Sequence, residues 1–280
     1  TPFSGELWYM DPYYKNPLSA QWNFGMQHQI SPSMLVDANY VGSAGSRLNR
    51  GGRYNVALAP GPGAISPRTP FPHAQQSFFD RSWGRSKYHA FQFQLNKRYT
   101  NGLQYMVSYT WSKSMDIGAS GWYGVEGFSV QDAYNWNNDR SVSGFDLTHV
   151  LAVNWVYDLP VGRGRGLDLG NNVLNNVIGG RQVNGIASFQ SGIPYTVNIS
   201  GDLANVGNTG NYLRPIVVGN HRLDNPSPNR WFNQQAFALP PHVPGSPGIK
   251  QYGNAGRNIL RGDGRNNFDL SLFKKIGFQE

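Results

Sequence analysis

The stretch Gln21-Trp22-Asn23-Phe24-Gly25-Met26-Gln27-His28-Gln29-Ile30 alternates between large, mostly apolar side chains and Gln, Asn or Gly. The same alternation returns over 91–96 and again over 103–112. A period of two predicts β-strands with one apolar and one polar face. The apolar face is rich in aromatic side chains, and the polar face carries amides and hydroxyls rather than charges.

Strands of this kind are typical of a transmembrane β-barrel, in which side chains alternate between lipid and a wet lumen. Charged residues make up 14% of the 280 residues, compared with about 25% in a typical soluble domain. The mean hydropathy is nevertheless −0.49, so the polarity comes mainly from neutral groups. We therefore predict an all-β, antiparallel transmembrane β-barrel in the bacterial outer membrane.

The composition also excludes several classes of site. The chain has no Cys, which rules out disulfides, thiolate nucleophiles and Cys-based zinc sites. No apolar run approaches the roughly 18 residues of a transmembrane helix. The net charge of +8 comes from scattered residues, so we do not expect nucleic-acid binding. We expect instead that outer-membrane lipid and lipopolysaccharide contact one group of arginines through their phosphates: Arg47, Arg50, Arg53, Arg81 and Arg85.

Seven long strands are expected, at 19–30, 34–42, 87–99, 103–115, 145–158, 181–191 and 266–278. Short connections alternate with long ones: 31–33 and 100–102 are tight, whereas 43–86, 116–144 and 192–265 are long. This sorting is typical of outer-membrane barrels with short periplasmic turns and long extracellular loops. The connection 159–180 contains one amphipathic helix-like stretch. Seven is an odd number, so these strands predict only part of a closed barrel.

Several sequence motifs occur in a characteristic order. They are Gln21-Trp22-Asn23-Phe24-Gly25-Met26-Gln27, Asn39-Tyr40-Val41-Gly42-Ser43, Val107-Ser108-Tyr109-Thr110-Trp111-Ser112-Lys113-Ser114, Leu159-Pro160-Val161-Gly162-Arg163-Gly164, Ser191-Gly192-Ile193-Pro194-Tyr195, Arg230-Trp231-Phe232-Asn233 and Gly253-Asn254-Ala255-Gly256-Arg257-Asn258. Together they resemble the C-terminal barrel of Oar-like TonB-dependent transporters, which carry a carboxypeptidase-regulatory-like domain.

This resemblance implies a signal peptide, a plug domain and a barrel of about 22 strands. It also implies a TonB-type energising partner that acts through the plug. We expect residues 1–280 to be a segment of that barrel, with no plug, no signal peptide and the C-terminal strands missing.

The sequence offers no catalytic constellation. The six His residues do not have the sequence spacing of metal ligands. The sequence also places no combination of nucleophile and general base around Asp132, Asp139 and Asp146. Gly162, Gly164 and Gly166 are not followed by the Lys-Ser/Thr of a phosphate loop. We expect no enzyme activity, no cofactor and no metal.

Aromatic residues outside the strands are the candidate ligand-binding groups, because their rings can stack on a sugar or another planar ligand. They are Trp83, Trp122, Tyr123, Trp136 and Trp231. Packing of the loops on one another is the alternative role for these rings. Aromatics near strand ends, such as Trp22, Trp111 and Trp155, are expected to form interfacial girdles.

The expected function is ligand capture and uptake as part of a TonB-dependent receptor barrel, with an unknown ligand. Two alternatives remain open. One is a structural or adhesive outer-membrane barrel without transport, and the other is a soluble β-sandwich that binds carbohydrate. A plug upstream would favour transport over adhesion, and solubility without detergent would favour the sandwich.

Overall fold

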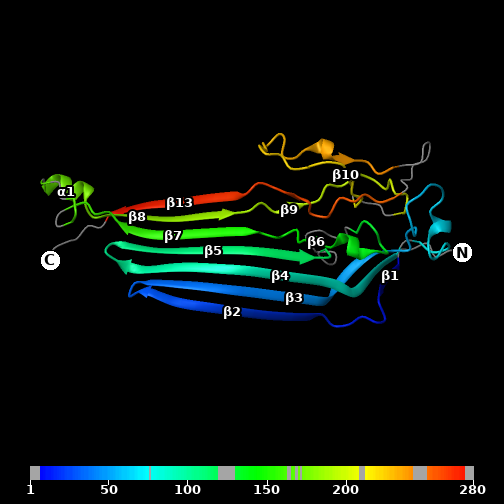
Figure 1. The fold of residues 1–280 in the computed structure, drawn as a ribbon, viewed down its shortest axis with the longest axis horizontal. Coiled ribbons are helices and arrows are strands. Elements are labelled where there is room, and N and C mark those ends of the chain that lie inside the picture. The colour runs from blue at the N-terminus through cyan, green and yellow to red at the C-terminus, as the bar shows by residue number, and fades with distance from the viewer. Residues whose placement is uncertain are drawn as a thin grey trace.

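The computed structural model describes residues 7–75, 77–118, 130–162, 165–167, 170, 172–207, 212–241 and 251–274. Its main element is one nine-stranded sheet in which seven long strands follow one another as an antiparallel meander (Figure 1). The order across the sheet is β13-β8-β7-β5-β4-β3-β2. These strands are β2 (Leu18–Ser31), β3 (Met34–Tyr54), β4 (Ser77–Thr100), β5 (Leu103–Asp116), β7 (His149–Asp158), β8 (Arg181–Gln190) and β13 (Arg265–Lys274).

All seven predicted strands are present, but several boundaries differ from the sequence-based ones. The predicted loop 43–86 is wrong in part, because β3 continues to Tyr54 and β4 begins at Ser77. Gly and Ser residues erase the hydrophobic alternation there, while backbone pairing persists through two register shifts near Leu48. The strand β7 begins only at His149, since the carboxylate of Asp146 accepts the backbone N–H of Ser114 in place of a strand partner. Residues 275–278 of the last predicted strand lie outside the described residues.

Shorter elements complete the fold. The strand β1 (Leu7–Met10) pairs in parallel with β4, and β6 (Ser141–Val142) pairs with β5. Two small two-stranded sheets join β10 (Ile216–Val217) to β11 (Phe237–Ala238) and β9 (Pro194–Tyr195) to β12 (Leu260–Arg261). The helices are short: η1 (Ser66–Arg68), η2 (Trp136–Asp139), η3 (Gln234–Ala236) and α1 (Asn172–Ile178).

The connections are sorted between the two ends of the sheet, as the sequence predicts. At the turn end, Asn101 and Gly102 both have positive φ, 52° and 76°, and close the hairpin between β4 and β5. The helix α1 also lies at this end, as predicted for the connection 159–180 (Figure 1). At the opposite end, which we call the loop end, the three long connections gather.

The register keeps the two faces in phase across all seven long strands. One row across the sheet is polar or small: Gln27, Asp37, Gln94, Ser108, Ala152, Ser188 and Asn267. The neighbouring row is mainly apolar: Met26, Ala38, Phe93, Tyr109, Leu151, Phe189 and Asn266. We call these the polar face and the apolar face.

The buried clusters lie at the loop end, where the start of β4 meets the long connections. One cluster contains Phe79, Ile117, Val130 and Trp136, and a second contains Ala57, Ile199, Ala204, Val206 and Leu213. On the apolar face, by contrast, Phe24 and Met26 are each 68% exposed and Leu270 is 69% exposed. A continuous apolar surface of this size, uncovered by the described residues, indicates contact with another apolar phase.

Candidate ligand pocket at the loop end

A pocket of about 510 Å³ lies at the loop end, where β3 and β4 extend beyond the rest of the sheet. We call it the Trp83 pocket. Its lining comes from β3, from β4, from the residue after β5 and from the segment around η2. It comprises Ser46, Arg47, Ser82, Trp83, Arg85, Ile117, Tyr134, Asn135, Trp136 and Asn137. Aromatic rings, amides, hydroxyls and two guanidinium groups therefore surround one cavity, and no carboxylate belongs to this described lining.

The two tryptophans have different roles in this pocket. Trp136 is 6% exposed, stacks on Phe79 with ring centroids 5.4 Å apart, and donates its indole N–H to the carbonyl of Ala133 at 2.6 Å. Trp83 is 48% exposed and meets Trp136 edge-on, with the centroids 5.2 Å apart. The buried ring thus holds the exposed ring in place, and about half of the Trp83 side chain remains exposed.

Three hydrogen bonds fix the segment that carries the pocket's amides. The carboxylate of Asp132 accepts the backbone N–H of Tyr134 at 2.9 Å and that of Asn135 at 3.2 Å. The hydroxyl of Tyr134 donates to the carbonyl of Val56 at 2.7 Å, which ties this segment to the end of β3. Burial raises the pKa of this hydroxyl to about 12.

The arginines at this end divide into two groups. Arg47 and Arg85 are exposed and line the pocket. Arg50 is only 1% exposed and lies over the ring of Trp136, so the prediction that it contacts lipid phosphates is wrong. Arg53 lies over Phe78, and Arg81 lies over Trp83 and pairs with Asp11. These three guanidinium groups therefore lie against aromatic rings of the folded loop end. The sequence pattern does not reveal these contacts, because they depend on how the loops pack.

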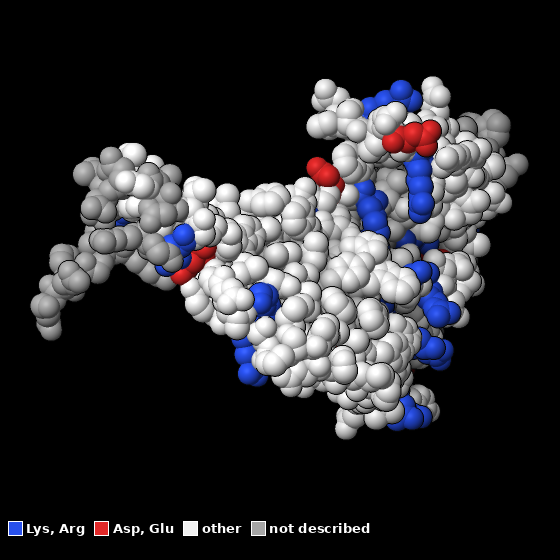
Figure 2. Space-filling view, turned by 60° about the vertical axis from the view of Figure 1, so that its left-hand side comes forward, with Lys and Arg blue, Asp and Glu red and all other residues white. Residues whose placement is uncertain are grey.

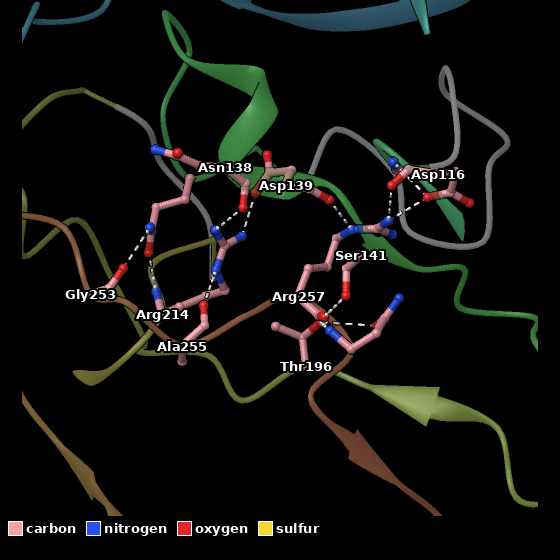
Figure 3. Close-up of polar contacts among 12 residues, drawn as sticks. Asp116, Asn138, Asp139, Ser141, Thr196, Arg214, Gly253, Ala255 and Arg257 are labelled. Atoms are coloured by element: carbon pink, nitrogen blue, oxygen red, sulfur yellow. Dashed lines mark hydrogen bonds and ion pairs between the residues drawn. The ribbon is translucent and has the colours of Figure 1, made fainter. Parts of the chain in front are cut away.

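Buried ion pairs fasten the long connections to each other beside the pocket (Figure 3). Arg214 pairs with the carboxylate of Asp139 and donates to the carbonyls of Asn138 and Ala255 at 3.2 and 2.8 Å. Arg257 pairs with Asp116 and donates to the carbonyl of Asp139 at 2.9 Å. Burial raises the pKa of the Asp139 carboxyl, and the charge of Arg214 opposes this effect.

The model of the outer membrane beta barrel domain family matches residues 1–280. The chain belongs to this family. The uncovered apolar face is therefore the lipid-facing surface of a partial, unclosed barrel, and the protein is located in the bacterial outer membrane. The soluble-sandwich alternative is wrong, because the long strands form a single membrane-type sheet instead of two packed layers.

Among solved structures, the barrel is similar to the outer membrane transporter YddB from Escherichia coli. The identity is 10% and the TM-score is 0.42. The match covers 68% of this chain and 22% of that chain, so the present chain corresponds to less than a quarter of that transporter. No curated protein sequence matches the chain.

The barrel brings together only part of the predicted aromatic set. Trp83 and Trp136 share one pocket, whereas Trp231 lies in another pocket of about 500 Å³, where its indole N–H donates to the carbonyl of Arg261 at 2.5 Å. Trp122 and Tyr123 lie outside the described residues. The prediction does not include Tyr134, Asn135 and Asn137. Their position within two residues of Trp136 in the sequence is the signal that could have indicated them.

No group of three or more metal-binding side chains occurs within the described residues. No helix in that part of the chain is long and apolar enough to span a membrane.

Proposed function

We propose that this barrel segment belongs to a TonB-dependent receptor that captures a ligand at the cell surface and takes it up. The observation that carries the proposal is the in-phase polar face, which lines the barrel interior with amides and hydroxyls over seven strands. A neutral, polar interior suits the passage of a water-soluble ligand. The sequence resemblance to Oar-like transporters supports the same function.

In this proposal the Trp83 pocket makes the first contact with the ligand. The exposed ring of Trp83 stacks on a sugar or another flat group. Asn135 and Asn137 offer hydrogen bonds around that ring, and Arg47 and Arg85 offer paired donors to a carboxylate or phosphate. Binding and passage, not catalysis, are the tasks of these residues. A plug and a TonB-type energising partner act on the captured ligand from parts of the receptor other than residues 1–280.

The buried ion pairs support capture because they hold the pocket in shape before the ligand arrives. Arg214 joins Asp139, in the segment after β5, to the long connection before β13. Arg257, in the same connection, pairs with Asp116 at the end of β5. A pre-organised pocket loses less conformational entropy on binding than a flexible one.

Uptake is tested by comparing cells with and without the intact receptor in a complex medium. We expect at least one compound to be depleted only by receptor-bearing cells, and depletion to stop when the proton-motive force is collapsed. Trp83→Ala should slow that depletion, while Trp8→Ala, which removes another partly exposed Trp at the loop end, should not. Energy-independent binding without depletion would contradict uptake and favour the adhesive alternative.

A further inference from the structure

A second pocket, of about 520 Å³, lies where the apolar face meets the loop end. We call it the Lys113 pocket. Four of its lining residues, Tyr40, His89, Phe91 and Trp111, stand on the apolar face of β3, β4 and β5. The lining also contains three cationic side chains, Lys113, Arg222 and Arg261, together with the small or neutral residues Ala90, Ser112, Val142 and Thr148.

The floor of the pocket is an aromatic row of the lipid-facing surface close to the loop end. Tyr40 is the cross-strand neighbour of Phe91, and Phe91 is the neighbour of Trp111. The hydroxyl of Tyr40 forms a hydrogen bond with Nδ1 of His89 at 2.7 Å. Trp and Tyr concentrate at the level of lipid headgroups, so this row marks the border of the hydrocarbon layer.

The cations converge on this border from different parts of the chain. Lys113 is two residues beyond Trp111 in β5 and therefore stands on the same face. Arg222 and Arg261 come from the long connection before β13. Figure 2 shows Lys and Arg side chains gathered at the loop end, on the right of the view, whereas the adjoining surface carries few of them.

Within the described residues, protein carboxylates balance only part of the positive charge of the pocket. Arg261 pairs with Asp146, whose carboxylate also accepts the backbone N–H of Ser114 at 2.6 Å. Within the described residues, neither Lys113 nor Arg222 forms an ion pair. The described lining contains no carboxylate, so the site has excess positive charge directly above an aromatic floor.

We propose that the Lys113 pocket binds the phosphate groups of an outer-leaflet glycolipid, lipopolysaccharide, whose acyl chains lie on the Tyr40–Phe91–Trp111 row. Guanidinium groups bind phosphate through paired charge-assisted hydrogen bonds, and Lys adds a point charge. The aromatic floor supplies the apolar contact that a free phosphate could not use. Because Arg222 and Arg261 belong to one long connection, the bound lipid would also fasten that connection to the membrane border.

The test is the amount of lipopolysaccharide retained by the full-length receptor after purification in detergent, measured by native mass spectrometry. The variant carries Lys113→Gln with Arg222→Gln. Its matched control carries Lys97→Gln with Arg98→Gln, which removes the same charges at the turn end. We expect the first variant to retain at least about tenfold less lipid than the wild type. The reason is that loss of a charge-assisted contact lowers the affinity by about one power of ten. The control should match the wild type.

Two further measurements distinguish recognition of a phosphorylated lipid from binding of free phosphate or of the acyl chains alone. Lys113→Arg with Arg222→Lys should keep most of the lipid, because both charges remain. The wild-type receptor should bind dephosphorylated glycolipid much more weakly than phosphorylated glycolipid, and inorganic phosphate more weakly still. Equal retention by the Gln variant and its control would overturn the proposal. Equal binding of the two glycolipid forms, or inorganic phosphate binding as well as the lipid, would overturn it too.

Discussion

Asp139 shows at the residue scale how the loops depend on buried charge. Its side chain is 1% exposed and pairs with Arg214, which is 4% exposed. Removing one partner of a buried ion pair leaves the other charge uncompensated, and this typically costs about 3–5 kcal/mol. Neutralising Asp139 should therefore loosen the connections that shape the Trp83 pocket.

We expect Asp139→Asn to lower the stability of the loop end by about 3–5 kcal/mol. The readout is the denaturant dependence of loop proteolysis in the folded receptor. Asp11→Asn is the control, because its ion pair with Arg81 is partly exposed and should contribute about 0–1 kcal/mol. Equal protease sensitivity of the two variants would contradict a structural role for the buried pair.

Tyr134 gives the loop end a dependence on alkaline pH. Its pKa is raised by burial to about 12 in the folded protein, compared with about 10 in an unfolded chain. The folded state therefore favours the neutral phenol, and the stability that it adds is complete below pH 10 and is lost as the pH rises through 12.

We expect the loop end of the wild type to lose stability between about pH 10 and 12, and Tyr134→Phe to reduce that loss. Loop proteolysis across this pH range, together with tyrosinate absorbance, measures both effects. Tyr13→Phe serves as the control, because Tyr13 is 83% exposed. An unchanged pH profile in Tyr134→Phe would show that another group is responsible.

At the scale of a strand, alternation decides which substitutions the barrel tolerates. Val107 in β5 lies between Leu95 and Val153 on the apolar face. Ser108, its neighbour in sequence, lies between Gln94 and Ala152 on the polar face. One residue therefore separates lipid from the aqueous interior.

Val107→Arg should destabilise the barrel by about 2–4 kcal/mol, because the charge enters the hydrocarbon layer. Ser108→Arg should cost far less, since its side chain remains in water. Refolding of the full-length receptor into lipid vesicles, followed by denaturant titration, measures the difference. Similar losses for both variants would contradict the assignment of the two faces.

The elements also show how far sequence reasoning reaches. The period-two pattern of β2 and β5 and the Asn101-Gly102 turn are local features, so they predicted strands and a hairpin correctly. The extension of β3 beyond residue 42 was not predictable, because glycine and serine leave no pattern and only pairing with β4 makes it a strand. The contact of Trp155 with Gly185 of the neighbouring strand likewise depends on the register.

At the scale of the whole molecule, the two edge strands of the sheet need further strands as pairing partners before the barrel can close. Within the described residues, the strands β2 and β13 are each paired with a long strand on one side only. Each unsatisfied backbone group in hydrocarbon costs several kcal/mol, so open edges do not persist in a membrane. Strands outside this sheet must pair with both edges in the assembled barrel.

We therefore expect the outward amides of β2 and β13 to be protected from hydrogen exchange in the membrane-embedded receptor. Protection should approach that of β5, which is paired on both sides. Peptide-resolved exchange in lipid nanodiscs measures it. Rapid exchange confined to alternate amides of either edge strand would show that the edge is open.

The sequence by itself determined the strands, their two faces and the sorting of turns and loops, because alternation and turn chemistry act over a few residues. It also marked Trp83 and Trp136 as candidate ligand contacts. Only the tertiary structure decided that these two rings share a pocket while Trp231 lies elsewhere. It alone revealed that Arg50 is buried and that Lys113, Arg222 and Arg261 meet at the lipid border. Such groupings join residues far apart in the sequence, and only the packing of the long connections brings them together.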